Sequence, residues 1–234
     1  MESPSDTTGT NGRIPLGSTG GDTTHAFPST VIKDGSTYKM WYSGNNGTNW
    51  RIFYATSSDG LTWTKNKNAI ESASDTTGTA GRIPLGVTGA DTSGAFDPTV
   101  IKDGSTYKMW YAGYDGSNYR ILYATSSDGL TWTKHDNSVP ANTDLLSTEG
   151  RVGLGTSGTG DDGNIYGLTV IKDGDLYRMW YGGSDGSDFR TYYATSLDGL
   201  NWSKVDNSTP AETDLSSSHG RIGLGSSGNA DDED

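Results

Sequence analysis

A repeat of about 69 residues constrains the fold of this chain more than any other feature of its sequence. The segment Gly12-Arg13-Ile14-Pro15-Leu16-Gly17 returns at 81–86, 150–155 and 220–225, with spacings of 69, 69 and 70 residues. A fixed period is typical of arrays in which each repeat is one supersecondary unit that packs on its neighbours. We therefore predict a single repeat domain over 1–234, with repeats at about 5–73, 74–142 and 143–212 and a partial copy at 213–234.

Between these markers lies a block that occurs three times and that predicts four short strands. In the second copy, β-branched and aromatic runs are separated by Asp103-Gly104, a Gly-Ser-Asn loop and Asp128-Gly129. Such turns favour an antiparallel meander. Apolar residues fall on both faces of the second strand, with Tyr107, Met109 and Tyr111 on one and Trp110 on the other. This pattern indicates an all-β β-propeller of three four-stranded antiparallel blades. The four runs are 99–102, 107–111, 120–125 and 130–134.

Composition supports this fold class and excludes several functions. Only 31% of the residues are hydrophobic, yet the chain has 34 Gly, 13 Tyr and 7 Trp, which suits short strands with an aromatic core. The net charge of −12 argues against nucleic acid, and the absence of Cys excludes disulfides and thiolate metal sites. No apolar run is long enough to span a membrane. The first residues do not begin a signal peptide, so the compartment stays unknown, with an extracellular or surface location favoured by the binding role below.

The blade block resembles the five-bladed propeller glycosidases of glycoside hydrolase family 43 and its relatives among arabinanases, xylosidases and fructan-acting enzymes. The resemblance rests on three stretches that recur in all copies, and a weaker likeness is to the Asp box of sialidases. In the second copy the three stretches are Phe96-Asp97-Pro98 with the following residues to Gly104, Tyr107 to Tyr111, and Tyr123 to Trp132.

The resemblance implies an inverting glycosidase site with a base Asp, a second Asp that orients, and an acid Glu on different blades. Two carboxyl groups must lie on opposite sides of the anomeric carbon with room for water. Asp97 matches the base position, whereas the equivalent residues are Pro28 and Gly167 in the other copies. Every Glu lies in a connection or near a terminus, so the acid has no counterpart on a blade strand.

Two sets of repeated side chains are candidate ligand-binding residues. Aromatic rings at the ends of hairpin loops suit stacking on pyranose rings, although they would equally pack a blade edge; they are Trp50, Tyr119 and Phe189, with Tyr114 in a neighbouring loop. Repeated arginines most often tie loops to carboxylates or carbonyls, and the sharper reading is that they bind carboxylated sugars or sulfate. These arginines are Arg13, Arg82, Arg151 and Arg221.

Aspartates in the connections are weak candidates for a metal site. No required cofactor is expected, and Ca²⁺ remains an option because carboxylate and carbonyl oxygens are its ligands. Solvated loop residues are the ordinary interpretation, since the chain has no Asp-x-Asp-x-Asp loop. The four candidates are Asp22, Asp91, Asp161 and Asp162.

Three blades rarely close a propeller, because natural rings typically use four to eight. Two chains would supply six blades, so we expect a homo-oligomer that forms a two-chain ring, with a three-bladed unit and a longer array as the alternatives. The near-identity of the repeats favours a non-catalytic module for carbohydrate binding, adhesion or self-assembly. The alternative is an inverting arabinanase-like or xylosidase-like hydrolase that uses Asp97 and is completed by oligomerisation.

Overall fold

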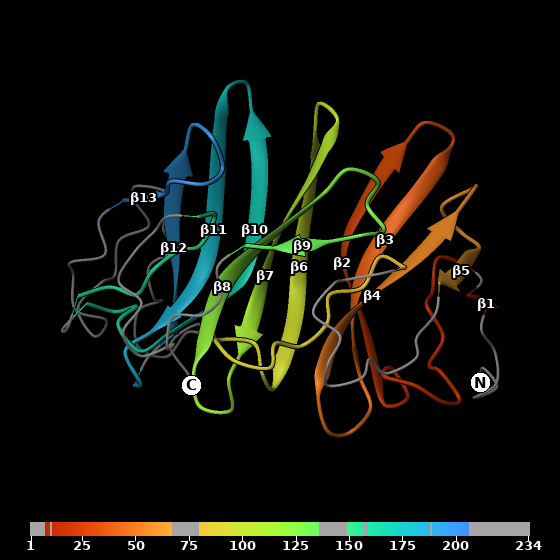
Figure 1. Cartoon of the computed structure of the whole chain (residues 1–234), viewed down its shortest axis with the longest axis horizontal. Helices are drawn as coiled ribbons and strands as arrows, with labels where there is room; N and C mark the ends of the chain where they lie inside the picture. Colours follow the sequence, from red (N-terminus) through yellow and green to blue (C-terminus); the bar gives the residue numbers. More distant parts are fainter. Residues whose placement is uncertain are drawn as a thin grey trace, which may run out of the picture.

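The computed structural model describes residues 8–9, 11–66, 80–135, 149–156, 159–187 and 189–205, which form strands and turns without a helix. These strands make three separate antiparallel sheets, one for each repeat (Figure 1). The prediction of an all-β propeller built from blade repeats is confirmed. No helix in this part of the chain could cross a membrane. The partial fourth copy at 213–234 lies outside the described residues.

The second sheet shows how each blade is built. It runs in the order β6 (Gly94–Asp103), β7 (Thr106–Tyr114), β8 (Tyr119–Ser126) and β9 (Thr133–Lys134). The Asp-Gly turns join neighbouring strands as expected, because Gly104 and Gly129 adopt positive φ. The third sheet has the same order, with β10 (Asn164–Asp173), β11 (Leu176–Ser184), β12 (Phe189–Ser196) and β13 (Ser203–Lys204).

The first blade has one strand more than the sequence predicts. Its order is β1 (Thr8–Gly9), β5 (Trp63–Asn66), β4 (Trp50–Ser57), β3 (Thr37–Asn45) and β2 (His25–Asp34). The extra strand β1 comes from the segment that precedes the first blade. Its Thr8 lies opposite Thr64 and its Gly9 lies opposite Trp63. This segment therefore covers the outer edge of the first blade, which the four-stranded prediction left open.

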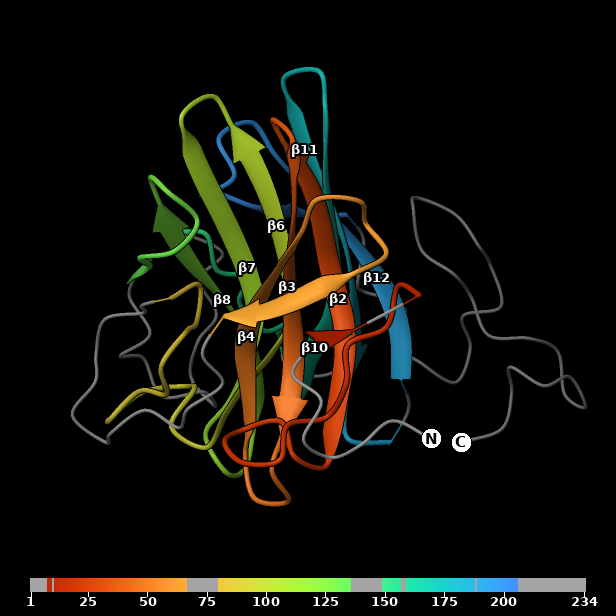
Figure 2. The same ribbon diagram turned by 90° about the vertical axis from the view of Figure 1, so that its right-hand side faces the viewer.

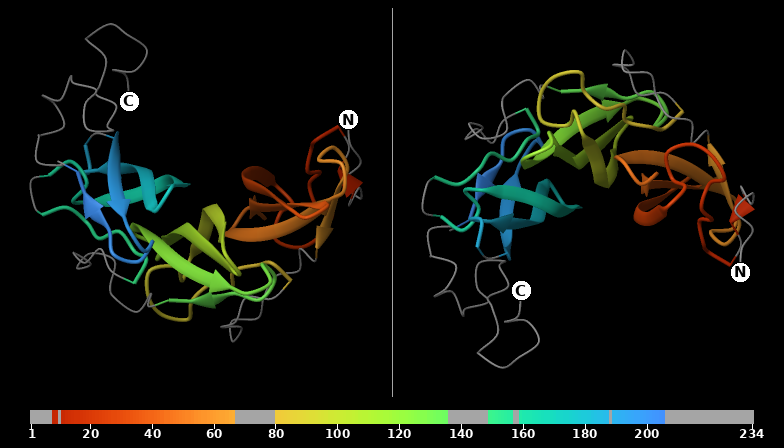
Figure 3. Two further views of the ribbon diagram at one scale, coloured as in Figure 1. Left: turned by 90° about the horizontal axis from the view of Figure 1, so that it is seen from above. Right: turned by 90° about the horizontal axis from the view of Figure 1, so that it is seen from below.

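The blades stand face to face around an arc that is open on one side (Figure 3). The first strands lie side by side, with β6 in contact with both β2 and β10. Apolar residues on both faces of each sheet fill the space between blades. Tyr107, Met109 and Tyr111 pack toward the first blade, and Trp110 packs toward the third, as the pattern on this strand predicts.

The repeated Gly-Arg-Ile-Pro-Leu-Gly segment lies between two blades. Gly81 donates its backbone N–H to the carbonyl of Leu130 in the second blade at 2.7 Å, while Ile83 bridges to Ile52 in the first. A Cβ atom at Gly81 would lie 2.3 Å from the Cβ of Tyr54, so only glycine fits this close approach. The same segment around Val152 bridges to Ile121 at the next junction. In the side view of Figure 2 these connections run beside the sheets. The described part of each connection therefore packs between two blades.

Candidate functional site

A groove of about 950 Å³ crosses all three blades at the end where their first strands begin. Two positions in each repeat contribute an aromatic ring to its walls: one near the start of the first strand and one at the first residue of the third strand. The rings at these positions are Phe27, Phe96 and Tyr166, and Trp50, Tyr119 and Phe189.

These six rings form a continuous row, here called the aromatic row. Within a blade, Phe27 stacks on Trp50 with ring centroids 5.7 Å apart. Across the junctions, Trp50 lies 6.3 Å from Phe96 and Tyr119 lies 5.3 Å from Tyr166. Phe96 and Tyr119 pack edge to face at 5.8 Å, and Tyr166 contacts Phe189 at the same distance. The row therefore follows the arc from the first blade to the third.

Short polar hairpin loops hold the rings in place. The loop before Trp50 is closed by the backbone N–H groups of Thr48 and Asn49, which donate to Asn46 Oδ1 at 3.1 and 3.2 Å. Asn49 Nδ2 then donates to the carbonyl of Ser93 in the next blade at 2.6 Å. Because this loop is tied to the second blade, the ring of Trp50 is positioned by two blades at once.

At the second junction the side chain of the tie comes from the later blade. Asn164 Oδ1 accepts the backbone N–H of Tyr119 at 2.9 Å. Tyr114 stacks on Tyr119 with centroids 4.5 Å apart, and its hydroxyl donates to the carbonyl of Gly116 at 2.7 Å. Burial, reinforced by the neighbouring Tyr114 hydroxyl, raises the pKa of Tyr119, so its ring keeps a neutral hydroxyl.

Asp97 lies in the groove at an irregularity of the second blade. The register between β6 and β7 shifts between Phe96 and Thr99, and Asp97 between them adopts a φ of +49°. Gly167 takes a φ of +59° at the equivalent position, where a residue without a side chain is unstrained. A non-glycine residue held in this region is a backbone outlier of the kind found at functional sites.

The surroundings of Asp97 change the acidity of its carboxyl group. Burial raises the pKa of Asp97, and a hydrogen bond from Ser43 opposes that shift. Its backbone N–H donates to Ser43 Oγ at 2.8 Å, so the first blade fixes the residue. Asp97 is the one carboxylate in the described lining of the groove.

Five of the fourteen residues that line the groove are candidates from the sequence. Trp50, Tyr119, Phe189, Tyr114 and Asp97 all line the groove. The rings on the first strands were missed, although the residue before Pro28, Asp97 and Gly167 is aromatic in every copy. That repeated aromatic was the available signal. The groove residues that sequence reasoning missed include Phe27, Phe96, Tyr166, Asn49 and Asn164.

The repeated arginines do not lie at this site. Arg82 and Arg151 are only 8% and 3% exposed, while Arg13 is exposed, and the described lining of the groove includes none of the three. Arg13 is more exposed than Arg82 and Arg151 because no blade precedes the first repeat in the described array. Arg221 lies outside the described residues. The binding of anionic ligands by these arginines stays a prediction.

The expectation of solvated aspartates is wrong for Asp22, Asp91 and Asp161, which are fully buried. Each accepts a hydrogen bond from a Tyr and one from a Lys of its own blade, in a set that we call the Tyr–Asp–Lys triad. Burial makes the carboxylate depend on these partners, since an unpaired buried charge is costly. The distances to Tyr and Lys are 2.8 and 2.7 Å for Asp22 with Tyr42 and Lys65, 3.0 and 2.6 Å for Asp91 with Tyr111 and Lys134, and 2.8 and 2.8 Å for Asp161 with Tyr181 and Lys204.

Asp162 is half-buried, and its backbone N–H donates to the carbonyl of Thr159 at 3.3 Å. In the part of the chain that the structure describes, no three His, Cys, Asp or Glu side chains come together as a metal site would require. A Ca²⁺ site stays an untested expectation.

Comparison with known proteins supports the fold. No family model matches the chain. Two uncharacterized proteins of Mycobacterium tuberculosis, MT1551 and Rv1502, are each 39% identical to it over 111 residues, which cover 44% of this chain and 31% of theirs. The match thus spans about a third of the length of these curated relatives.

Solved structures with a similar fold are glycoside hydrolases. A family 117 enzyme from Zobellia galactanivorans matches with a TM-score of 0.56 at 14% identity, over 76% of this chain and 54% of its own. Fructan 1-exohydrolase IIa from Cichorium intybus gives 0.56 at 19%, over 90% and 35%. The family 32 β-fructofuranosidase from Bombyx mori gives 0.55 at 14%, over 81% and 36%. A specific likeness to family 43 stays a prediction. The described blades therefore share the propeller fold of these glycoside hydrolases.

Proposed function

We propose that this protein binds a neutral glycan chain along the aromatic row. The observation that carries the proposal is the continuity of six rings across three blades, in a groove open to solvent. Binding sites combine a mostly apolar wall with a few oriented polar groups. Sugar rings present both apolar C–H faces and hydroxyl groups, so they match such a surface.

The polar groups of the groove suit hydroxyl groups of a sugar. Asn45, Asn49 and Asn164 line it and offer amide groups, which both donate and accept hydrogen bonds. The described lining contains no Lys or Arg, which favours a neutral glycan over a carboxylated or sulfated one. A row that continues from blade to blade favours an extended chain over a single sugar.

Tyr119 is the residue at which to test the proposal. It stands in the middle of the row and contacts Phe96, Tyr114 and Tyr166. Binding to fructans, arabinans and xylans would be measured by calorimetry or affinity electrophoresis. We expect Tyr119→Ala to weaken binding by about tenfold or more, as loss of a central aromatic contact typically does.

Tyr119→Phe is the matched control because it keeps the ring and removes only the hydroxyl. We expect this variant to bind within about twofold of the native protein, because stacking needs only the ring. Equal binding by the native protein and Tyr119→Ala, or no binding to any neutral glycan, would refute the proposal.

A second candidate function is glycoside hydrolysis with Asp97 as the base. It is favoured by the strained backbone of Asp97, by its place in the groove and by the structural relatives. Inversion needs a second carboxyl group about 6.5–9.5 Å away. The described lining offers Asp97 alone, so the acid would have to come from other residues or from a partner.

Turnover of aryl glycosides separates the two candidates. If the protein is a hydrolase, Asp97→Asn removes turnover while binding to the aromatic row persists, because the rings remain. Binding without turnover in the native protein supports the non-catalytic role. Turnover that survives Asp97→Asn excludes Asp97 as the base.

A further inference from the structure

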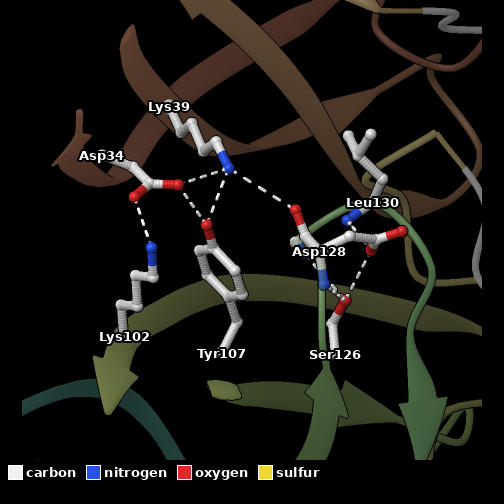
Figure 4. Close-up of polar contacts among 8 residues, drawn as sticks. Asp34, Lys39, Lys102, Tyr107, Ser126, Asp128 and Leu130 are labelled. Carbon is white, nitrogen blue, oxygen red and sulfur yellow. Dashed lines mark hydrogen bonds and ion pairs between the residues drawn. The ribbon is translucent and has the colours of Figure 1, made fainter. Parts of the chain in front are cut away.

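The two junctions between blades are held by the same polar arrangement, which we call the clasp. At the first junction Asp34 accepts hydrogen bonds from Lys102 and from the hydroxyl of Tyr107, both in the second blade (Figure 4). Lys39 Nζ lies 2.8 Å from Asp34 Oδ2 and donates to Tyr107 Oη at 2.7 Å. Together these contacts join a turn of one blade to the first and second strands of the next.

The second junction repeats the clasp one repeat later. Asp103 accepts from Lys172 and from the hydroxyl of Tyr177, and Lys108 Nζ donates to Tyr177 Oη at 2.7 Å. Lys108 also reaches the carbonyl of Asp198 at 2.9 Å. The clasp thus recurs with the repeat, and it combines an Asp from one blade with a Lys and a Tyr from the next.

An aromatic contact lies beside each clasp. Trp41 packs on Trp132 of the next blade with centroids 5.9 Å apart, and Trp110 packs on Trp202 at 5.8 Å. Both Trp41 and Trp110 are 0% exposed. A junction therefore buries one whole indole ring against the following blade.

The last described blade presents the first half of this junction without its second half. Asp173 stands at the position of Asp34 and Asp103, and its side chain is 62% exposed, with Arg178 Nε 3.0 Å away. Trp180 stands at the position of Trp41 and Trp110, and it is only half-buried. Ile171, on the same face, is 43% exposed.

The first blade presents the second half. Lys33 lies 5.2 Å from the ring centroid of Tyr38, as Lys102 and Lys172 lie 5.3 Å from the rings of Tyr107 and Tyr177. The donor side of the clasp is therefore already arranged. Apolar positions on this face are open: Val31 is 47% exposed, whereas the equivalent Val100 and Val170 are 3% and 4% exposed, and Leu61 is 59% exposed.

We propose that a second copy of this chain docks head to tail, with the third blade of one copy on the first blade of the other. Asp173 then receives the partner's Lys33 and the partner's Tyr38, and Trp180 packs on the ring of the partner's Tyr38, as Trp110 packs on Tyr177 with centroids 5.8 Å apart. The charges are complementary, because the carboxylate end of one copy meets the ammonium end of the other. Each contact has a counterpart inside the chain, so docking requires no new kind of junction.

Docking would also extend the site. Phe27 and Phe189 are the two ends of the aromatic row and are 54% and 52% exposed. Head-to-tail contact brings Phe189 beside the partner's Phe27, as Trp50 lies beside Phe96. If both ends dock, two copies close one ring with two equivalent junctions. The docking itself does not depend on glycan binding.

A charge swap tests the interface, measured as mass by light scattering and as a self-association constant by sedimentation from about 1 to 100 μM protein. We expect the native chain to have twice the mass of one chain. Asp173→Lys and Lys33→Asp should each weaken association by about tenfold or more, because each places like charges together. Asp173→Lys combined with Lys33→Asp in one chain should restore the native association.

Two further variants keep the test independent of folding. Asp175→Lys reverses a charge at the same hairpin, and its counterparts Ser36 and Ser105 take no part in the clasp, so association should not change. Val31→Glu puts a charge on an exposed apolar position and should give monomers with an unchanged unfolding midpoint. A native chain that stays monomeric, single variants that still associate, or a swap that fails to restore association would each overturn the proposal.

Discussion

The interior of each blade and the groove that crosses the blades follow opposite rules. The Tyr–Asp–Lys triad has the same three residue types in all three blades, with hydrogen bonds of 2.6 to 3.0 Å. In the groove, one position holds Pro28, Asp97 or Gly167, and another holds Trp50, Tyr119 or Phe189. The residues of the triad are thus repeated without change, whereas the residues at these two groove positions vary from repeat to repeat. Changes to the interior should therefore affect stability, and changes to the groove should affect binding.

The largest effect is expected in the interior, from Asp91→Ala. This change leaves the buried ammonium group of Lys134 and the hydroxyl of Tyr111 without their carboxylate. We expect the free energy of unfolding to fall by about 3–5 kcal/mol. Urea denaturation measures it, with the exposed Asp175→Ala as a control that should stay within about 0.5 kcal/mol. A loss below about 1 kcal/mol would show that the triad is not what holds the blade.

A glycine at a junction should come next. Gly81→Ala adds a Cβ atom 2.3 Å from the Cβ of Tyr54, at a φ of +79°. We expect a loss of about 2–4 kcal/mol from crowding and backbone strain together. Gly104→Ala carries similar strain, with a φ of +59°, but meets nothing within 4 Å. For Gly104→Ala we expect the free energy of unfolding to fall by about 1–2 kcal/mol, which measures the backbone strain without the crowding. Equal losses for the two variants would mean that the junction tolerates the added atom.

In the groove, Asp97→Gly should make the protein more stable. Glycine relieves the positive φ of this residue, and the change also removes a partly buried carboxyl group. We expect a gain of about 0.5–1 kcal/mol in urea denaturation. A loss of stability would instead mean that Asp97 stabilises the fold, as the interior residues do, and would contradict the distinction between groove and interior at this position.

The smallest effect concerns pH. Burial raises the pKa of Asp97 above 3.8, so the folded protein favours its protonated form. The stability difference between Asp97→Asn and the native protein should therefore grow in favour of the variant as pH rises from below 3.8 through the raised pKa, and stay constant above it. Urea midpoints from about pH 2 to pH 7 would show this trend.

For Asp59 we expect the opposite dependence of stability on pH. Backbone N–H groups of Thr62 and Leu61 lower its pKa to about 2, so its contribution is complete above 3.8 and is lost as pH falls. Asp59→Asn should be less stable than the native protein above pH 3.8, and the two should converge near pH 2. The same sign for both variants would contradict these local environments.

The blade strands could be predicted from sequence because their signals are local. Asp-Gly turns and alternating aromatic residues lie within a few positions of each other, as at Asp103-Gly104 and Tyr107. The positions of Trp50 and Tyr119 at the ends of hairpin loops could be predicted for the same reason, and their role in binding stays a prediction.

Contacts between distant positions could not be predicted. Asp34 meets Lys102 across 68 residues, and a turn aspartate in the sequence gives no sign that it also joins two blades. Asp22 lies in a connection that looks solvated, and its burial depends on Lys65, which is 43 residues away. Sequence periodicity identifies equivalent residues but does not reveal which of them face each other across a junction.

The aromatic row has a consequence for how such proteins change over time. Every repeat adds two rings, and every junction uses one face from each of two consecutive repeats. Duplication or loss of one whole repeat in the gene would therefore lengthen or shorten the row by two rings without inventing a new contact. Under the proposed function, the number of repeats in the gene would then set the length of glycan chain that the row can contact.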